Sequence, residues 1–475
     1  MLDLTGAEPL GKGGEAAVFA VPGTAWAAKV YHDHDAARAA KLRAMLANPP
    51  EDPTASQGHV SIAWPQDLLI DVRGRVAGYV MPMVRGMGLI ADYYFPKVRR
   101  AKYPLFTYHY LVATAQNLAT AVRALHGRGY VMGDVNEGNI LVAPTAMLTL
   151  VDTDSFQVRE PGGGRVHRCR VGTLLYTPRE LQEVDFAKVE RGEEHDLFGL
   201  GVLLFQLLME STHPFQARYA GPGEPPEPQM VIAAGGFPHG TGSALWQPPR
   251  HAPAFGMLDA RLRGLFTRCF VNGHRDPKAR PPADEWRAAL VDAAAALVPC
   301  PRNASHFHWP HAKPCPWCER AAKLGGRDPF PALAQVRAGS HLKPLRKGPP
   351  PVSRPQPQVR PQVQPRPQPA RQVQPQSRVA PQLQPRQLPA PQVQHRPQIT
   401  RQSRRVRPSM TRLRPTQGLN LFLNRLVLWV ALAAVAAAIG VTIIWLIFSL
   451  GTWPSNSGRN NDYERHGPPT RRPTR

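Results

Sequence analysis

Three polar residues that together could carry out phosphoryl transfer lie close in the middle of the chain. Asp134 precedes Asn139 by five residues, and Asp152 ends an apolar stretch that follows them. Phosphoryl transfer needs one carboxylate to orient the attacking hydroxyl and accept its proton. It also needs an amide oxygen and a second carboxylate to hold Mg²⁺ on the phosphates. The order and spacing of the three residues indicate this chemistry, and three unrelated loop or capping residues are the alternative.

A second set of residues with binding chemistry lies near the N-terminus. Gly11, Gly13 and Gly14 precede Val18, and the apolar, strand-like segment that follows carries Lys29. Glycines let the backbone of a hairpin approach phosphate groups closely, and a lysine on the next strand can contact them as a point charge. These five residues are therefore candidates for nucleotide binding, although a glycine-rich turn alone is as often an ordinary turn.

The two sets resemble the nucleotide-binding, catalytic and metal-binding loops of protein kinases. The resemblance covers about residues 8–295. It implies an α+β, two-lobed protein kinase-like fold with ATP in the cleft between the lobes. It assigns Asp134 as the catalytic carboxylate, with Asn139 and Asp152 as ligands of Mg²⁺, for which Mn²⁺ is an alternative. Lys29 then contacts the phosphates of ATP.

Other residues extend the same resemblance. Met81 and Met83, at the end of an apolar strand, stand where kinases present backbone groups to adenine. Glu180 and Arg280 match a structural ion pair behind the activation segment, and Asp196 matches a buried residue that braces the catalytic loop. More narrowly, the chain is similar to bacterial serine/threonine kinases of the helix-hairpin-helix or YegI type in GYVMP at 78–82, GDVN at 133–136, DTDSFQV at 152–158 and HDLFGLGVLLFQLL at 195–208.

This family implies a reaction and a set of partners. Its members transfer the γ-phosphate of ATP to Ser or Thr hydroxyls of proteins, and they are often found beside metal-dependent protein phosphatases. We therefore expect ATP, cytoplasmic protein substrates and a cognate phosphatase as partners. A small-molecule kinase is disfavoured because residues 171–180 resemble a peptide-binding activation segment. No specific nucleic acid is expected.

Three departures from the kinase pattern bear on mechanism. Met132 and Gly133 replace the usual His-Arg, so no arginine is available there to hold a phosphorylated activation loop. Asn136 replaces a lysine that would help at the transferring phosphoryl group, so we expect slow turnover. Thr153 and Asp154 replace Phe-Gly, which supplies an additional acid near the metals.

The fourth departure concerns the partner of Lys29. The helix expected over residues 35–47 contains no Glu to form the usual ion pair, and only Asp35 or Glu51 could substitute. Loss of that pair usually costs activity. The alternative function is therefore a nucleotide-binding pseudokinase that signals by docking without phosphoryl transfer.

A cluster of thiols and imidazoles follows the kinase-like part. A Cys-x-x-Cys pair with one more Cys and a His nearby supplies the four ligands that a tetrahedral structural zinc ion prefers. His308 and His311 are alternatives for the nitrogen ligand, and a redox pair or free thiols are the competing interpretations. We predict a structural zinc site at Cys300, His306, Cys315 and Cys318.

Composition divides the 475 residues into unlike parts. Residues 1–300 contain 30 basic and 30 acidic side chains, so the net charge of +24 belongs to the rest of the chain. Five cysteines are too few for a secreted disulfide framework, and the first residues do not look like a signal peptide. The expected parts are a kinase-like domain over 1–297, a zinc-knuckle-like segment over 298–325, a Pro/Gln/Arg-rich disordered linker over 326–420, a transmembrane helix over 421–450 and a short non-cytoplasmic tail over 451–475.

The transmembrane prediction rests on residues 426–448, which run for 23 residues without a charge. At about 1.5 Å per residue this length crosses a hydrocarbon core of about 30 Å. Arginines are more frequent on the N-terminal side of this segment, and the positive-inside rule then places the kinase-like domain in the cytoplasm. We expect a single-pass protein of the inner (cytoplasmic) membrane, in contact with lipid and held on a long, extended linker.

Overall fold

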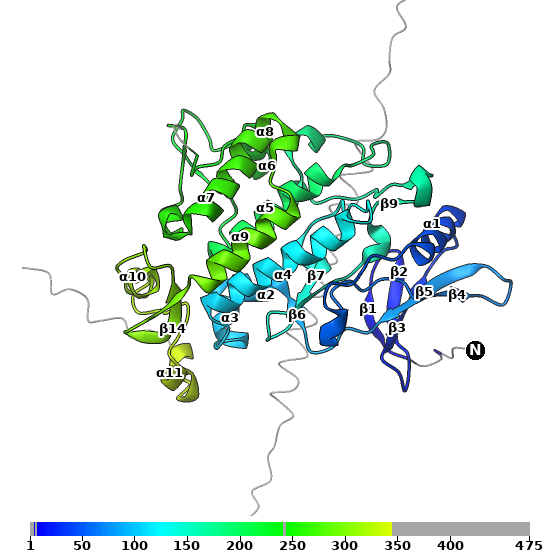
Figure 1. The fold of residues 1–475 in the computed structure, drawn as a ribbon, viewed down its shortest axis with the longest axis horizontal. Coiled ribbons are helices and arrows are strands. Elements are labelled where there is room, and N and C mark those ends of the chain that lie inside the picture. The colour runs from blue at the N-terminus through cyan, green and yellow to red at the C-terminus, as the bar shows by residue number, and fades with distance from the viewer. Residues whose placement is uncertain (1–3, 5–6, 241–243, 344–475) are drawn as a thin grey trace, which may run out of the picture. The chain divides into compact units, whose positions relative to one another are not determined.

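The N-terminal lobe is an antiparallel sheet with one helix beside it (Figure 1). The computed structural model describes residues 4, 7–240 and 244–343. The sheet has the order β1-β2-β3-β5-β4. Asp35 starts the helix because its carboxylate accepts hydrogen bonds from two backbone N–H groups of the first turn. The elements are β1 (Pro9–Lys12), β2 (Ala16–Ala20), β3 (Trp26–Tyr31), α1 (Ala36–Ala47), β4 (Asp67–Ile70) and β5 (Val76–Pro82).

The pairing of β3 with β5 fixes the position of Lys29. In this register Lys29 lies opposite Tyr79 and Val30 lies opposite Gly78. Gly78 is buried, and a Cβ atom on it would lie 2.0 Å from the carbonyl oxygen of Lys29. Only a residue without a side chain lets the two strands approach this closely.

The second lobe is built mainly from helices, of which α4, α5 and α9 run beside one another (Figure 1). Small pairs of strands lie among them, including β9 (Val158–Arg159) with β10 (Val166–His167) and β11 (Arg218–Tyr219) with β12 (Trp246–Gln247). The helices are α2 (Ile90–Tyr94), α3 (Pro96–Lys102), α4 (Tyr108–His126), α5 (Glu193–Leu208), α6 (Pro228–Ala233), α7 (Ala260–Thr267), α8 (Gly273–Arg275) and α9 (Ala283–Ala295).

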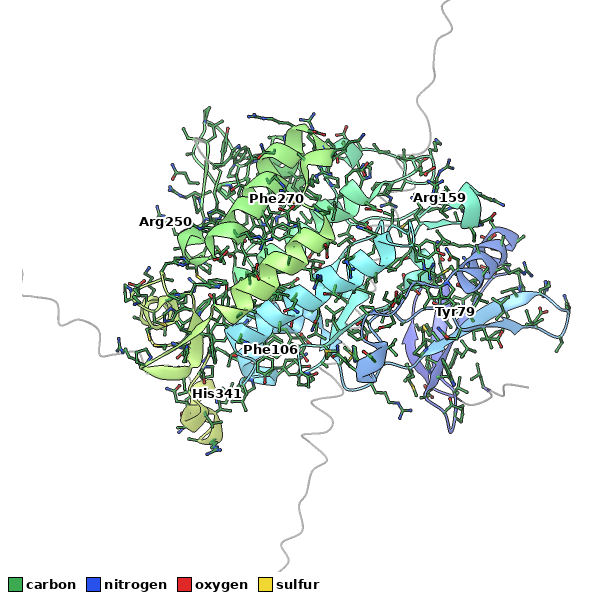
Figure 2. The ribbon with its side chains drawn as sticks, viewed as in Figure 1. Tyr79, Phe106, Arg159, Arg250, Phe270 and His341 are labelled. Carbon is green, nitrogen blue, oxygen red and sulfur yellow. The ribbon has the colours of Figure 1, made fainter. Side chains whose placement is uncertain are left out.

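The core of this lobe surrounds α5. Every residue of α5 from Asp196 to Leu208 is buried, which is expected of a helix that is apolar on all sides. Phenylalanines from neighbouring elements pack on it: Phe266 and Phe270 contact Phe205 of α5, and Phe270 is labelled in Figure 2. This core supports the loops that carry the polar residues.

A three-stranded sheet places two of those polar residues together. It has the order β6-β7-β8, with β6 (Gly88–Leu89), β7 (Ile140–Val142) and β8 (Leu148–Leu150). Ile140 pairs with Leu150, so Asn139 and Asp152 flank the same end of the β7-β8 hairpin. The backbone N–H of Val151 also donates to the carbonyl oxygen of Asn139.

The segment after α9 packs on the helical lobe. It comprises β13 (Val298–Cys300), β14 (Asn303–His308), α10 (Pro316–Lys323) and α11 (Leu333–Arg337). Trp309, Trp317 and Phe330 are buried around Tyr108 at the start of α4. The packed structure therefore continues past the predicted linker start at residue 326, because Phe330 is an integral part of this aromatic cluster.

The predicted transmembrane helix at 421–450 and the tail at 451–475 lie outside the described residues, as does the linker from residue 344. Among the described residues, no helix combines the length and the apolar character needed to cross a membrane.

Replacing Gly78 should test the packing of β3 on β5. Gly78→Ala is expected to lower the free energy of unfolding by about 1–3 kcal/mol, because the new methyl group pushes the strand carrying Lys29 away. Gly256→Ala is the matched control, since its Cβ meets nothing within 4 Å. Urea denaturation of both variants gives the comparison, and equal stability would contradict the close approach.

Candidate active site and metal centre

The catalytic loop holds Asp134 next to Asn139. The side-chain amide of Asn139 donates to the backbone carbonyl of Asp134 at 3.1 Å. The hydroxyl of Thr173 donates to the Asp134 carboxylate at 2.9 Å. Asp134 therefore has a fixed orientation, and its contact with Thr173 ties the catalytic loop to the activation segment.

Asp196 braces this loop from below, as expected from the resemblance. Its carboxylate is buried and accepts hydrogen bonds from the backbone N–H groups of Met132, at 2.6 Å, and Gly133, at 2.8 Å. His126 adds a third contact at 3.1 Å. Charged acceptors make strong hydrogen bonds, so α5 fixes the backbone just before Asp134.

The structural ion pair behind the activation segment is also present. The guanidinium of Arg280 contacts both carboxylate oxygens of Glu180, at 2.7 and 3.0 Å. Arg280 is buried, and the two parallel contacts restrict the relative orientation of the two groups.

Arg191 occupies the space that a side chain at position 133 would need. Gly133 has a left-handed backbone, with φ of +74°, and a Cβ on it would lie 2.8 Å from Cys169 and 3.0 Å from the Arg191 guanidinium. Arg191 is buried and donates to the carbonyl oxygens of Gly133, Cys169 and Val171, each at 2.6 Å. Arg191 therefore holds the segment around Val171 against the catalytic loop. The kinase motifs recognised in the sequence do not include this arginine.

Lys29 has two carboxylate partners, although α1 supplies no Glu. Its ammonium lies 2.5 Å from Asp152 and 2.6 Å from Asp154. Asp154 also accepts hydrogen bonds from the hydroxyls of Tyr31, at 2.6 Å, and Tyr79, at 2.8 Å. Neither of the substitutes predicted from sequence is used: Asp35 caps α1 instead, and Glu51 is among none of these contacts.

The charges in this network stabilise one another. Burial alone would lower the pKa of Lys29, but the carboxylates of Asp154 and Asp152 outweigh it and raise that pKa. Burial alone would raise the pKa of Asp154, but Lys29 and the hydroxyls of Tyr31 and Tyr79 lower it. Asp154 is thus a fixed anion that orients Lys29. The interpretation of Asp154 as an additional acid near the metals gives way to this role.

A cleft of 540 Å³ lies next to Lys29 and Asp152. Gly11 and Val18 of the hairpin line it from the small lobe, and Met81 borders it at the end of β5. The Asp152 side chain is 44% exposed, so its second oxygen remains open to a metal while the first contacts Lys29. Apolar walls with a lysine and a carboxylate at one end suit a nucleotide bearing Mg²⁺.

The remaining predicted nucleotide contacts are placed differently. Gly13 and Gly14 belong to the β1-β2 turn and do not line the cleft. Met83 lines it, but its backbone N–H donates to the carbonyl oxygen of Ala25 at 2.9 Å. Val84 follows as the next lining residue, so it is the better candidate for presenting a backbone N–H to adenine.

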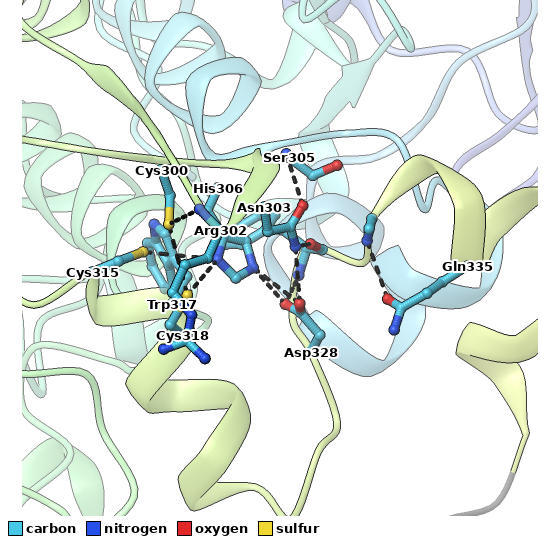
Figure 3. Close-up of polar contacts among 12 residues, drawn as sticks. Cys300, Arg302, Asn303, Ser305, His306, Cys315, Trp317, Cys318, Asp328 and Gln335 are labelled. Carbon is cyan, nitrogen blue, oxygen red and sulfur yellow. Dashed lines mark hydrogen bonds and ion pairs between the residues drawn. The ribbon is translucent and has the colours of Figure 1, made fainter.

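The four predicted zinc ligands converge at the end of the helical lobe (Figure 3). The sulfurs of Cys300 and Cys318 are 3.7 Å apart, and those of Cys315 and Cys318 lie 3.7 and 3.5 Å from Nδ1 of His306. A tetrahedral zinc ion with Zn–S bonds of about 2.3 Å separates its ligand atoms by about 3.5–3.8 Å. The four atoms therefore fit a structural zinc ion.

Asp328 orients the imidazole of this cluster. Its carboxylate lies 2.8 Å from Nε2 of His306, which leaves Nδ1 directed at the sulfurs (Figure 3). The two alternative histidines point elsewhere: His308 contacts the carbonyl of Trp309, and His311 contacts that of Leu258. The sequence offered no signal for Asp328, because it follows the last cysteine by ten residues.

The thiols are arranged for ionisation by a metal. Burial raises the pKa of Cys318 to about 12, with further contributions from Cys300 and Cys315. Burial also opposes ionisation of Cys300, but backbone N–H groups of Arg302 and Asn303 lower its pKa to about 7. A bound dication would remove the repulsion among thiolates that keeps Cys318 protonated.

A five-stranded sheet lobe and a helical lobe, with Lys29 and Asp152 lining the cleft and Asp134 and Asn139 in the adjacent loop, define a protein kinase-like domain. No family model matches the chain.

Comparison with individual proteins identifies relatives among the protein kinases. The chain is 33% identical over 316 residues to the protein kinase YegI of Escherichia coli K12, and 33% identical over 322 residues to that of Escherichia coli O157:H7. These matches cover 65% and 66% of this chain but 47% and 48% of the relatives, so the chain spans about half their length. A probable cAMP-dependent protein kinase catalytic subunit of Encephalitozoon cuniculi is 26% identical over 138 residues, which cover 29% of this chain and 38% of the relative. The resemblance to the YegI-type kinases is confirmed.

Removing the charge of Asp154 should test its role as the partner of Lys29. Asp154→Asn is expected to lower the free energy of unfolding at neutral pH by about 1.5–3 kcal/mol, because a buried charged hydrogen bond is lost. Asp33→Asn, on the exposed loop before α1, is the matched control. Urea denaturation measures both, and equal stability of the two variants would remove the assigned role.

The same variant has an expected pH dependence. The pKa of Asp154 is lower in the folded chain than in the unfolded chain. Its stabilisation is therefore present above the unfolded pKa of about 3.9 and is lost as the pH falls through the folded pKa. The stability difference between wild type and Asp154→Asn should be largest near pH 7 and shrink below about pH 4. A difference that grows on acidification would contradict this assignment.

Proposed function

We propose that this chain is an ATP-dependent protein kinase that transfers the γ-phosphate to Ser or Thr hydroxyls of cytoplasmic proteins while tethered to the membrane. The observation that carries the proposal is the ion-pair network at Lys29. It supplies the anionic partner whose absence from the helix sequence was the main reason to consider a pseudokinase.

Each residue of the site has a role in this reaction. Asp134 orients the acceptor hydroxyl and takes its proton, while Asn139 and the open oxygen of Asp152 hold Mg²⁺. Lys29, kept in place by Asp154, contacts the phosphates. ATP supplies the phosphoryl group, and the bound metal offsets the charge that develops on it.

The rate should be modest. Asn136 stands where kinases carry a lysine, and its side chain instead contacts the carbonyl of Asp134 and the N–H of Gly138. No cation from this position reaches the transferring group, so part of the electrostatic stabilisation of the transition state is missing.

The specificity for Ser and Thr and the membrane tether are supported by the sequence. The kinase-like motifs resemble those of bacterial serine/threonine kinases of the helix-hairpin-helix or YegI type. Residues 426–448 have the length and apolar character of a single span, with the domain expected on the cytoplasmic side. Phosphoamino-acid analysis and fractionation of membranes from cells expressing the whole chain test these two points separately.

We further propose that Cys300, His306, Cys315 and Cys318 hold a structural zinc ion. The support is the tetrahedral spacing of their ligand atoms and the carboxylate behind His306. With four protein ligands no coordination position remains for substrate, so the ion contributes stability and no chemistry to the reaction.

Phosphate incorporation tests the kinase proposal. The purified chain with radiolabelled ATP and Mg²⁺ should label itself or mixed protein substrates, whereas Asp152→Ala and Asp134→Asn should reduce the rate at least about 100-fold. Asp33→Ala is the control and should retain the wild-type rate. Equal labelling by wild type and Asp152→Ala would reject catalysis, and nucleotide binding without any labelling would favour the pseudokinase.

Metal content tests the zinc proposal. The purified chain should contain about one equivalent of zinc, and Cys318→Ser should lose it together with much of its thermal stability. His311→Gln is the control, because His311 faces backbone carbonyls instead of the thiols. Less than about half an equivalent in the wild type, or equal loss in both variants, would reject this assignment.

A further inference from the structure

A second cavity, of 250 Å³, lies between α1 and the segment 165–171. It shares no lining residue with the nucleotide cleft. Five cationic side chains and three carboxylates line this cavity, so cations outnumber anions. These cations are Arg38, Lys41, Arg165, Arg168 and Arg170.

Lys41 is the buried member of this group. It lies on α1, is only 9% exposed, and makes no hydrogen bond or ion pair with any described residue. Burial lowers its pKa to about 8, so the ammonium is still mostly charged at neutral pH. A buried ammonium without a partner is costly, and such groups are normally paired.

A second unpaired group borders the same cavity. The hydroxyl of Ser155 is inaccessible and has no hydrogen-bond partner among the described residues. The largely buried ammonium of Lys41, on α1, and the enclosed hydroxyl of Ser155, in the loop after β8, thus border one polar cavity. Buried polar groups in folded proteins are nearly always satisfied, which points to a bound group.

The carboxylates at the cavity are already engaged. Glu15 pairs with Arg38 at 3.2 Å, Asp35 caps α1, and Asp154 holds Lys29. None of the three contacts Lys41. Lys41 and the arginines of the segment 165–171 therefore form no ion pair with these carboxylates, although Asp154 and Asp152 are near enough to act on the pKa of Lys41.

The arginines of that segment are available to a ligand. Arg165, Arg168 and Arg170 are exposed at the rim, and their side chains make no hydrogen bond or ion pair within the described part of the chain. Guanidinium groups bind phosphate oxygens in pairs, and a buried ammonium adds a point charge.

We propose that this cavity binds a phosphate group, held by the ammonium of Lys41 and by the arginines of the segment 165–171. The cavity volume of 250 Å³ has room for a phosphate group. The group is carried either by a free small molecule or by a phosphorylated hydroxyl of this chain; Ser155 is the hydroxyl residue that borders the cavity, and its modification would require the loop after β8 to open. The cavity shares no lining residue with the nucleotide cleft, although Asp154, the partner of Lys29, borders it.

Thermal unfolding of the full chain with inorganic phosphate tests the proposal. Phosphate at about tenfold above its Kd should raise the Tm by about 2–4 °C relative to chloride at equal ionic strength. Lys41→Met should abolish this shift without lowering the Tm in chloride, because it removes an unpaired buried charge. Lys97→Met, an exposed lysine on α3, is the matched control and should keep the shift.

Two further variants locate the ligand. Arg168→Gln and Arg170→Gln are surface changes that leave the fold intact, and each should weaken phosphate binding at least about fivefold. Mass spectrometry of the chain distinguishes the sources. If Ser155 carries a covalent phosphate, the shift should appear only after phosphatase treatment, and if it carries none, the free phosphate is the ligand.

Two results would overturn the proposal. One is the absence of a phosphate-specific shift in a chain that carries no phosphate on Ser155. The other is a Lys41→Met variant that melts well below wild type in chloride, since the ammonium would then already have a stabilising role. Both measurements detect binding and not phosphoryl transfer, so they remain decisive if the kinase proposal fails.

Discussion

One buried carboxylate organises the small lobe around the nucleotide cleft. Asp154 accepts hydrogen bonds from Lys29 on β3, from Tyr31 at the end of the same strand and from Tyr79 on β5. It belongs to the loop after β8, so it joins the sheet of one lobe to the metal-binding loop of the other. The position of Lys29 thus depends on that loop and no longer on the orientation of α1. Helix α1 instead carries Lys41, which lines the cavity that Asp154 also borders.

The activation segment is also held by a charged side chain of the chain itself, Arg191. Arg191 donates to the backbone carbonyl of Gly133 in the catalytic loop and to those of Cys169 and Val171 in the activation segment. Gly133 has no side chain that would occupy the space of the guanidinium. An arginine is charged at any physiological pH and needs no modification to act. The segment near Val171 is held by an interaction that is present as soon as the chain folds. This accounts physically for a kinase-like chain that lacks the arginine before Asp134.

The sequence alone predicts which polar residues lie together where those residues are close along the chain. Asp134 and Asn139 are five residues apart in one loop, and the β7-β8 hairpin returns Asp152 to the same place, so local pattern alone predicts the group. Asp154 could be recognised in the sequence as an acid near the metal-binding loop, but its role could not be predicted. Its partners lie more than 70 residues away, on two other strands. Asp328 was missed for a similar reason: nothing in a thiol pattern says which carboxylate will lie behind the imidazole. Contacts between single polar residues that are far apart in the chain can be identified only from the three-dimensional structure.

The aromatic packing beneath the thiol cluster determines how mechanical load would enter the domain. Trp309 and Trp317 are wedged against Tyr108, and Arg100 of α3 holds the carbonyl of His341 near the end of the described chain. A pull on whatever follows residue 343 would therefore be borne first by α3, α4 and the thiol cluster. None of these residues lines the nucleotide cleft, so the load would not act on it directly. The aromatic cluster and the Arg100 contact thus make the end of the described chain a point of attachment that is separate from the nucleotide cleft.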